Sequence, residues 1–123
     1  MLSLNELPPS GSDRRYYRVK GKQHSALAVY NQWSKENQTF VDYSRHFKAK
    51  GLSVPEIYHF DALHNIYLLE DLGDQTLLMR LEAERNGPLI PDSVLHLYKN
   101  ALRDLAFMQI KGKEQLDLSL IHI

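Results

Sequence analysis

The sequence predicts an α+β fold: an antiparallel sheet of about five strands with one packed helix, followed by further helices. Two observations lead to this prediction. Strand-like apolar runs occur in closely spaced pairs, which implies hairpins and therefore antiparallel neighbours. Helical spacing of apolar residues replaces the strand pattern between the third and fourth runs and again after the fifth, so one helix can cover a face of the sheet. A chain of 123 residues fits one compact unit, or part of one.

Five segments have the composition of β-strands. They are rich in β-branched and aromatic residues or alternate apolar with polar side chains. The expected strands span residues 2–7, 16–20, 25–30, 56–60 and 66–70. Pro8 and Pro9 must end the first strand, because proline donates no ladder hydrogen bond. Polar turns at residues 21–23 and 61–65 predict two hairpins.

A helix is expected between the third and fourth strands, over residues 35–50. Phe40 and Phe47 lie on one helical face, and lysines fill the last turn. Ser34 is expected to cap the start of the helix, and Gly51 follows its end. Together these signals predict one helix packed against the sheet.

Two more helices are expected after the sheet. The first spans residues 75–85 and is broken at 86–88, Asn-Gly-Pro. The second opens at Pro91, ends at Gly112, and carries an apolar stripe from Val94 to Met108. That stripe is wide enough to need a partner surface.

Composition excludes several classes of function. Fifteen basic and fifteen acidic residues cancel, and no Lys/Arg block suggests nucleic acid or anionic lipid as a partner. The chain has no cysteine, and no apolar stretch approaches the roughly 18 residues of a membrane span, so we expect a cytoplasmic protein. Its six histidines show no metal-ligand spacing, and no metal site is predicted.

The loop between the first two strands has the residues of a phosphate-binding loop. Gly11 lets the backbone approach a ligand closely, and Ser10 and Ser12 add hydroxyl donors. The guanidinium of Arg14 or Arg15 can form a charge-assisted fork to phosphate, worth roughly 1.5–3 kcal/mol. The same composition is also typical of an ordinary surface turn with solvated arginines.

The fifth expected strand ends abruptly in Glu70, Asp71 and Leu72, followed by Gly73. This pattern suits a nucleotide hinge, in which the backbone binds the base. It also suits a buried strand that simply leaves the sheet for solvent, with Gly73 permitting a turn. The residues alone leave both interpretations open.

Three segments, in this order, resemble the aminoglycoside phosphotransferase and choline kinase family, which has a protein-kinase-like fold. The segments are Gly11–Val19, Gly51–Ile57 and Tyr67–Asp74. The likeness is nearest to bacterial kinases of cell-wall amino sugars. It covers only the amino-terminal lobe, residues 1–74, and the start of a truncated carboxy-terminal lobe, residues 75–123.

The resemblance implies an ATP-binding transferase, a kinase of small molecules whose acceptor is a sugar or amino sugar hydroxyl, with Mg²⁺ in the full-length enzyme. The loop from Ser10 to Arg15 would cover the nucleotide phosphates. The backbone of Glu70, Asp71 and Leu72 would hydrogen-bond the adenine edge, and Leu69 and Leu72 would pack against the ring.

One family feature is absent from the third strand. Many relatives place a lysine there, paired with a glutamate on the following helix, to hold the phosphates. The segment 26–31 has no lysine, so that ion pair is expected to be missing. Glu36 could orient Arg14, Arg15 or Arg18 instead, or only favour the helix dipole.

The catalytic loop of such kinases, with its aspartate base and metal-binding residues, has no counterpart after Gly112. Asp117 is interpreted there as a solvated turn residue. We therefore expect the chain alone to be inactive. The alternative is a non-catalytic, kinase-like interaction module, which could form a homodimer through the Val94–Met108 stripe.

Overall fold

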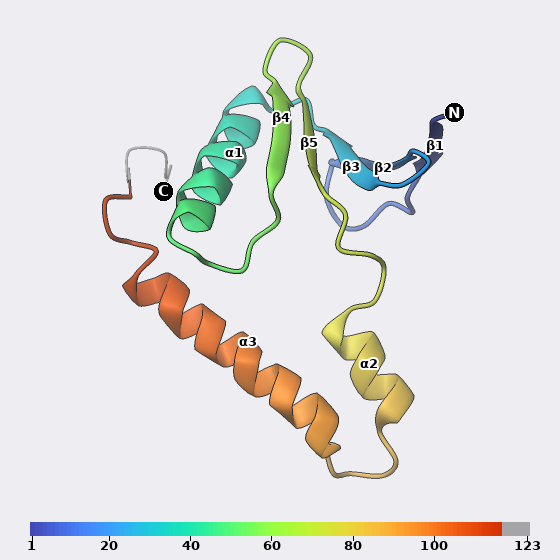
Figure 1. The fold of residues 1–123 in the computed structure, drawn as a ribbon, viewed down its shortest axis with the longest axis vertical. Helices are drawn as coiled ribbons and strands as arrows, with labels where there is room; N and C mark the ends of the chain where they lie inside the picture. Colours follow the sequence, from blue (N-terminus) through green and yellow to red (C-terminus); the bar gives the residue numbers. More distant parts are fainter. Residues whose placement is uncertain (117–123) are drawn as a thin grey trace. The chain divides into compact units, whose positions relative to one another are not determined.

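The computed structural model describes residues 1–116 and divides the chain into two compact units (Figure 1). Among these residues, the first unit comprises Met1–Leu72 together with Gln115 and Leu116, and the second comprises Gly73–Glu114. Within residues 1–116, no helix combines the length and the apolar character needed to cross a membrane.

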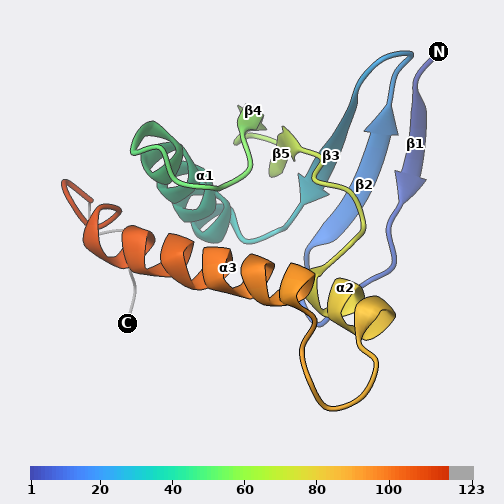
Figure 2. The same cartoon turned by 60° about the horizontal axis from the view of Figure 1, so that its bottom comes forward.

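As far as it is described, the first unit is a five-stranded antiparallel sheet with one helix, as predicted. Its strands are β1 (Ser3–Glu6), β2 (Arg15–Lys20), β3 (Ser25–Tyr30), β4 (Ile57–Asp61) and β5 (Ile66–Glu70). Their order in the sheet is β1-β2-β3-β5-β4, and every neighbouring pair is antiparallel. Helix α1 (Ser34–Ala49) joins β3 to β4 and contacts β4 (Figure 2). The α+β class and both hairpins are therefore confirmed.

The ends of α1 confirm one expectation and correct another. Gly51 has φ +79°, the left-handed conformation expected of glycine after a helix. The predicted Ser34 cap is wrong: Trp33 occupies the cap position and its side chain makes no capping bond. The Ser34 hydroxyl instead donates to Asn65 Oδ1, at 2.9 Å. Ser34 thus ties the start of α1 to the β4–β5 turn.

The hydrophobic core lies between α1 and one face of the sheet. Its buried members are Val29, Val41, Ile57, Tyr67 and Leu69. In the strand register, Val29 lies opposite Tyr67, and Leu27 lies opposite Leu69. Directly opposed residues share a face, so these side chains define the α1 face of β3 and β5. The Phe40 ring of α1 stacks on Tyr67 at 5.1 Å between centroids and so holds the helix to the sheet.

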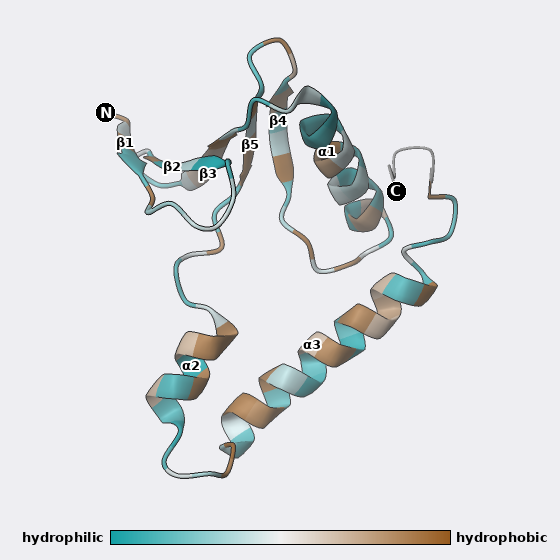
Figure 3. Ribbon diagram, turned by 180° about the vertical axis from the view of Figure 1, so that it is seen from behind, coloured by the Kyte–Doolittle hydropathy of each residue, from teal (hydrophilic) through white to brown (hydrophobic). Residues whose placement is uncertain are grey.

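The second unit is a pair of helices, as predicted. α2 spans Leu77–Glu84 and α3 spans Asp92–Ile110. Thr76 caps α2 by accepting the Met79 amide at 3.1 Å. Glu84 joins the two helices, because it accepts from Arg80 at 2.8 Å and from the Ser93 hydroxyl at 3.0 Å. Figure 3 shows hydrophobic and hydrophilic residues alternating along α3.

The core predicts where the first unit is sensitive to truncation. Ile57→Ala should lower the free energy of unfolding by about 2–5 kcal/mol, because it removes packing between β4 and α1. Leu63→Ala is the matched control, since Leu63 is 85% exposed and Ile57 only 8%. The control should change stability by less than about 0.5 kcal/mol in urea unfolding. Equal effects of the two substitutions would contradict this core.

Candidate functional site

Three arginines at and near the start of β2 each pair with a carboxylate from a different part of the first unit. The pairs are Arg14 with Glu36 at 2.8 Å, Arg15 with Glu6 at 3.0 Å, and Arg18 with Asp71 at 2.7 Å. The loop before β2 and the segment after β5, the two stretches singled out in the sequence, are therefore both held by charge-assisted contacts.

Glu36 of α1 is paired with Arg14 from the loop before β2, since β3 has no basic residue to pair with it. Its Nη2 donates to Glu36 Oε1 at 2.8 Å, and Asn31 Nδ2 donates to Glu36 Oε2 at 3.2 Å. The guanidinium also lies 5.7 Å from the Phe40 ring centroid, within range of a cation–π contact. β3 has no lysine, so no lysine–glutamate pair forms there, and of the three arginines that could have reached Glu36 it is Arg14 that does so.

The surroundings of Arg14 contain unused hydrogen-bonding capacity. We call Arg14, Asn31, Glu36, Phe40 and Tyr67 the Arg14 cluster. Within the described part of the chain, the buried atoms without a hydrogen-bond partner include three from this cluster: Arg14 Nε, Asn31 Oδ1 and the Tyr67 hydroxyl. Buried polar atoms are normally paired, so a group of them can accommodate water or polar ligand atoms.

Tyr67 is a buried titratable group of this cluster. Burial raises the pKa of Tyr67 to about 12, and the nearby Arg14 guanidinium opposes part of that rise. The phenol is therefore neutral at physiological pH and can act as a hydrogen-bond donor in the cluster.

Arg18 and Asp71 form the most buried of the three pairs. Nε and Nη2 of Arg18 donate to the two oxygens of Asp71, at 2.7 and 3.0 Å, and the Ser25 hydroxyl donates at 2.9 Å. The side chains are only 11% and 6% exposed. The Asp71 carboxylate is thus engaged in holding the chain where it leaves the sheet. No local sequence pattern pairs Arg18 with Asp71, because the two are 53 residues apart.

The remaining predicted residues of the loop are exposed. Ser10, Gly11 and Ser12 lie at the surface, and no other heavy atom lies near the position that a Cβ on Gly11 would take. The Ser12 hydroxyl accepts the Arg14 amide at 3.4 Å, and Arg15 pairs with Glu6. The loop thus presents backbone and hydroxyl groups outward, with Arg14 directed toward α1.

At the predicted hinge, Glu70 and Leu72 have different surroundings. The Glu70 amide donates to Glu56 O at 2.9 Å, and Glu70 Oε1 accepts the Glu56 amide at 3.1 Å. Leu72 is 67% exposed, whereas Leu69 belongs to the core. Of the two leucines expected to pack on a base, only Leu72 has its side chain at the surface.

The loop and the hinge lie at opposite ends of the same strands. Tyr30 lies opposite both Arg15 and Ile66 at the loop end, while Ala26 lies opposite Glu70 at the hinge end. Glu70 lies four residues after Ile66 along β5, which corresponds to about 13 Å. The structure therefore does not bring the two stretches together. They could contact only the two ends of an extended ligand.

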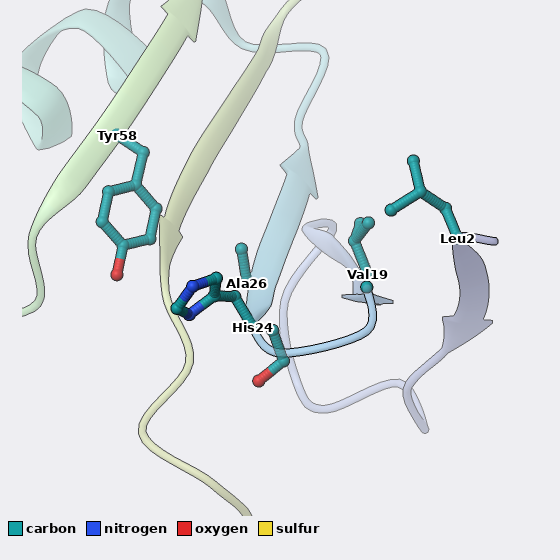
Figure 4. A pocket seen from close by; sticks show the side chains of 7 residues that line it. Leu2, Val19, His24, Ala26 and Tyr58 are labelled. Atoms are coloured by element: carbon teal, nitrogen blue, oxygen red, sulfur yellow. The ribbon is translucent and has the colours of Figure 1, made fainter.

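The opposite face of the sheet carries two hollows, away from the predicted site. One, of about 460 Å³, is lined by Leu2, Val19, Gly21, His24, Ser25, Ala26 and Tyr58 (Figure 4). The other, of about 230 Å³, is lined by Leu4, Tyr17, Ala28, Val29, Tyr30 and Ile66. None of the residues predicted to bind nucleotide lines either hollow.

The described residues offer no ready site for Mg²⁺. Across residues 1–116, no group of three or more His, Asp or Glu side chains is placed to hold a metal ion. Asp117, interpreted above as a turn residue, lies outside the described residues. No metal-dependent step is assigned to these residues.

Comparison with known proteins gives no assignment, because the chain matches no family model and no curated protein. What the site can bind is therefore inferred from its own residues and geometry.

The buried Tyr67 phenol predicts a loss of stability at high pH. The unfolded phenol deprotonates near pH 10 and the folded one near pH 12, so the folded state loses about 2–3 kcal/mol as the pH rises through this interval. Tyr67→Phe should remove that share of the decline in urea unfolding. Tyr58→Phe is the control, because Tyr58 is 53% exposed, and it should keep the wild-type pH dependence. An unchanged decline in Tyr67→Phe would contradict this assignment.

Proposed function

We propose that Met1–Leu72 is the nucleotide-binding lobe of an ATP-dependent small-molecule phosphotransferase, with a sugar or amino sugar hydroxyl as acceptor. The observation that carries the proposal is the contact between Arg14 and Glu36, which joins the predicted phosphate loop to the first turn of the only helix of this unit within residues 1–116.

The Arg14–Glu36 contact resembles an arrangement used in protein kinases. There, a lysine on the third strand pairs with a glutamate on the next helix and holds the nucleotide phosphates. Here the helix after β3 supplies Glu36, Asn31 at the end of β3 contacts the same carboxylate, and the cation comes from the loop. The antiparallel sheet with a helix between its third and fourth strands is compatible with such a lobe.

Arginine can serve as the phosphate ligand in this arrangement. Its planar guanidinium carries five donors, so one edge can stay on a carboxylate while another meets phosphate oxygens. The Arg14 side chain is 23% exposed, so solvent reaches it although its Nε is buried. Ser10 and Ser12 in the same exposed loop can add donors.

The base would lie at the other end of the strands. The backbone after β5 is held by Asp71, and the exposed Leu72 side chain offers an apolar surface. The spacing of about 13 Å between the strand ends suits an extended nucleotide, with its phosphates near Arg14 and its base near Leu72. The proposal covers binding of ATP by this lobe and assigns no transfer step to the described residues.

The proposal predicts that ATP stabilises the chain. At a concentration of 100 times its Kd, ATP should add about 2.7 kcal/mol to the free energy of unfolding. Arg14→Ala should weaken ATP binding by roughly 10- to 100-fold, because it removes a charge-assisted fork. The double variant Arg14→Ala/Arg15→Ala should weaken ATP binding at least as much as Arg14→Ala alone. Thermal unfolding with and without ATP measures this.

Arg103→Ala is the control for that experiment, because Arg103 is an exposed arginine on α3 in the second unit. It should keep the wild-type response to ATP. If ATP does not protect the wild-type chain, nucleotide binding is wrong. If Arg14→Ala is protected as well as the wild type, Arg14 is not the phosphate ligand.

The alternative function is a non-catalytic, kinase-like interaction module. Its support is the apolar stripe of α3, on which Leu102 and Leu105 are 66% and 51% exposed. Exposed apolar patches on a helix favour association with a partner. A second copy of this chain is the simplest such partner.

This alternative makes its own prediction. The wild-type chain should sediment as a dimer at micromolar concentration, and Leu102→Glu/Leu105→Glu should sediment as a monomer, because charges on the stripe oppose burial. Lys99→Glu, on an exposed position of the same helix outside the stripe, is the control and should remain dimeric. A monomeric wild-type chain rules out self-association through α3.

A further inference from the structure

Asp71 is held from two neighbouring strands at the point where the chain leaves the sheet. Arg18 of β2 donates twice to its carboxylate, and Ser25 at the start of β3 donates once. Asp71 directly follows Glu70, the last residue of β5. The direction of the backbone after β5 is therefore fixed by contacts that come from β2 and β3.

Such a buried pair is poorly explained by stability alone. Removing two charges from water has a large cost, and apolar residues of similar size are often as stabilising as a buried ion pair. What a bidentate pair adds is geometry, because the guanidinium fork accepts a carboxylate in few orientations. The side chains of Arg18 and Asp71, at 11% and 6% exposure, meet this description.

The pair lies on the α1 face of the sheet. Arg18 is opposite Leu27, and Leu27 is opposite Leu69 of the core. The Arg14 cluster contacts the same face through Tyr67 and Phe40. Two charged groups thus stand at the two ends of one face, about 13 Å apart along the strands.

We propose that Arg18 and Asp71 are positioning residues that set the backbone of residues 70–72 to receive the base of a nucleotide, while Arg14 serves the phosphates. This inference rests on the proposed function. Sites more than about 7–10 Å apart that share no partner respond independently to substitution. Base recognition and phosphate recognition should therefore be separable by mutation.

The test compares ATP with inorganic tripolyphosphate, which carries the phosphates without the base. The variant is Arg18→Met/Asp71→Leu, because replacing both partners by apolar residues avoids leaving one charge buried and unpaired. Calorimetric titration of the full 123-residue chain should show ATP binding weakened about tenfold or more and tripolyphosphate binding changed less than about twofold. Arg14→Ala should weaken both ligands.

Two further variants keep the test decisive. Ser25→Ala removes a single donor to Asp71 and should weaken ATP alone by about two- to fivefold, so it serves if the double variant fails to fold. Arg80→Met/Glu84→Leu is the matched control. It removes an arginine–glutamate pair of the second unit, in which Arg80 Nε lies 2.8 Å from Glu84 Oε1, and it should leave the affinities for ATP and tripolyphosphate unchanged.

Each result distinguishes this inference from the proposed function. If the wild-type chain binds tripolyphosphate and ATP, and the folded Arg18→Met/Asp71→Leu variant binds ATP normally, the positioning role is wrong and the proposed function stands. An equal loss for both ligands also overturns the positioning role. If the wild-type chain binds neither ligand, the proposed function itself fails, and this inference fails with it.

Discussion

The packing of α1 against the sheet through Tyr67 is the constraint on which the rest of the first unit depends. Tyr67 is 1% exposed, stacks on Phe40 at 5.1 Å, and meets Phe60 edge-on at 6.5 Å. This contact sets where the first turn of α1 lies and therefore where Glu36 meets the loop. A charged contact at the surface is thus positioned by an apolar one in the core, which is the usual way a fold gives precision to polar groups.

The arginines near β2 divide the unit into two functional ends. Arg14 is directed toward α1, while Arg18 is directed toward the segment after β5. The intervening strand carries Tyr16 against the core, so the two ends are joined by a rigid element. One strand thus carries the Arg14–Glu36 pair just before its start and the buried Arg18–Asp71 pair near its other end.

Much of the fold followed from the sequence, because local signals agreed with one another. The five strands and three helices found in residues 1–116 were all predicted from apolar spacing, turns and prolines, and the antiparallel pairing followed from short connections. The Ser34 cap was wrong because Asn65, 31 residues away, competes for the hydroxyl. Local patterns could not predict that Arg18 pairs with Asp71. They also could not predict which arginine pairs with Glu36. Both contacts depend on strand order and register, which no local pattern encodes.

The edge strand β1 holds one end of the loop before β2 without any buried side chain. All four of its residues are exposed and none belongs to the core, so its pairing with β2 relies on the ladder and on the Glu6–Arg15 contact. Because no residue of β1 is buried, β1 can separate locally from β2 at low cost, while the Arg14–Glu36 contact still holds the loop to α1. The loop can thereby change its conformation on the β1 side while the contacts of the core stay in place.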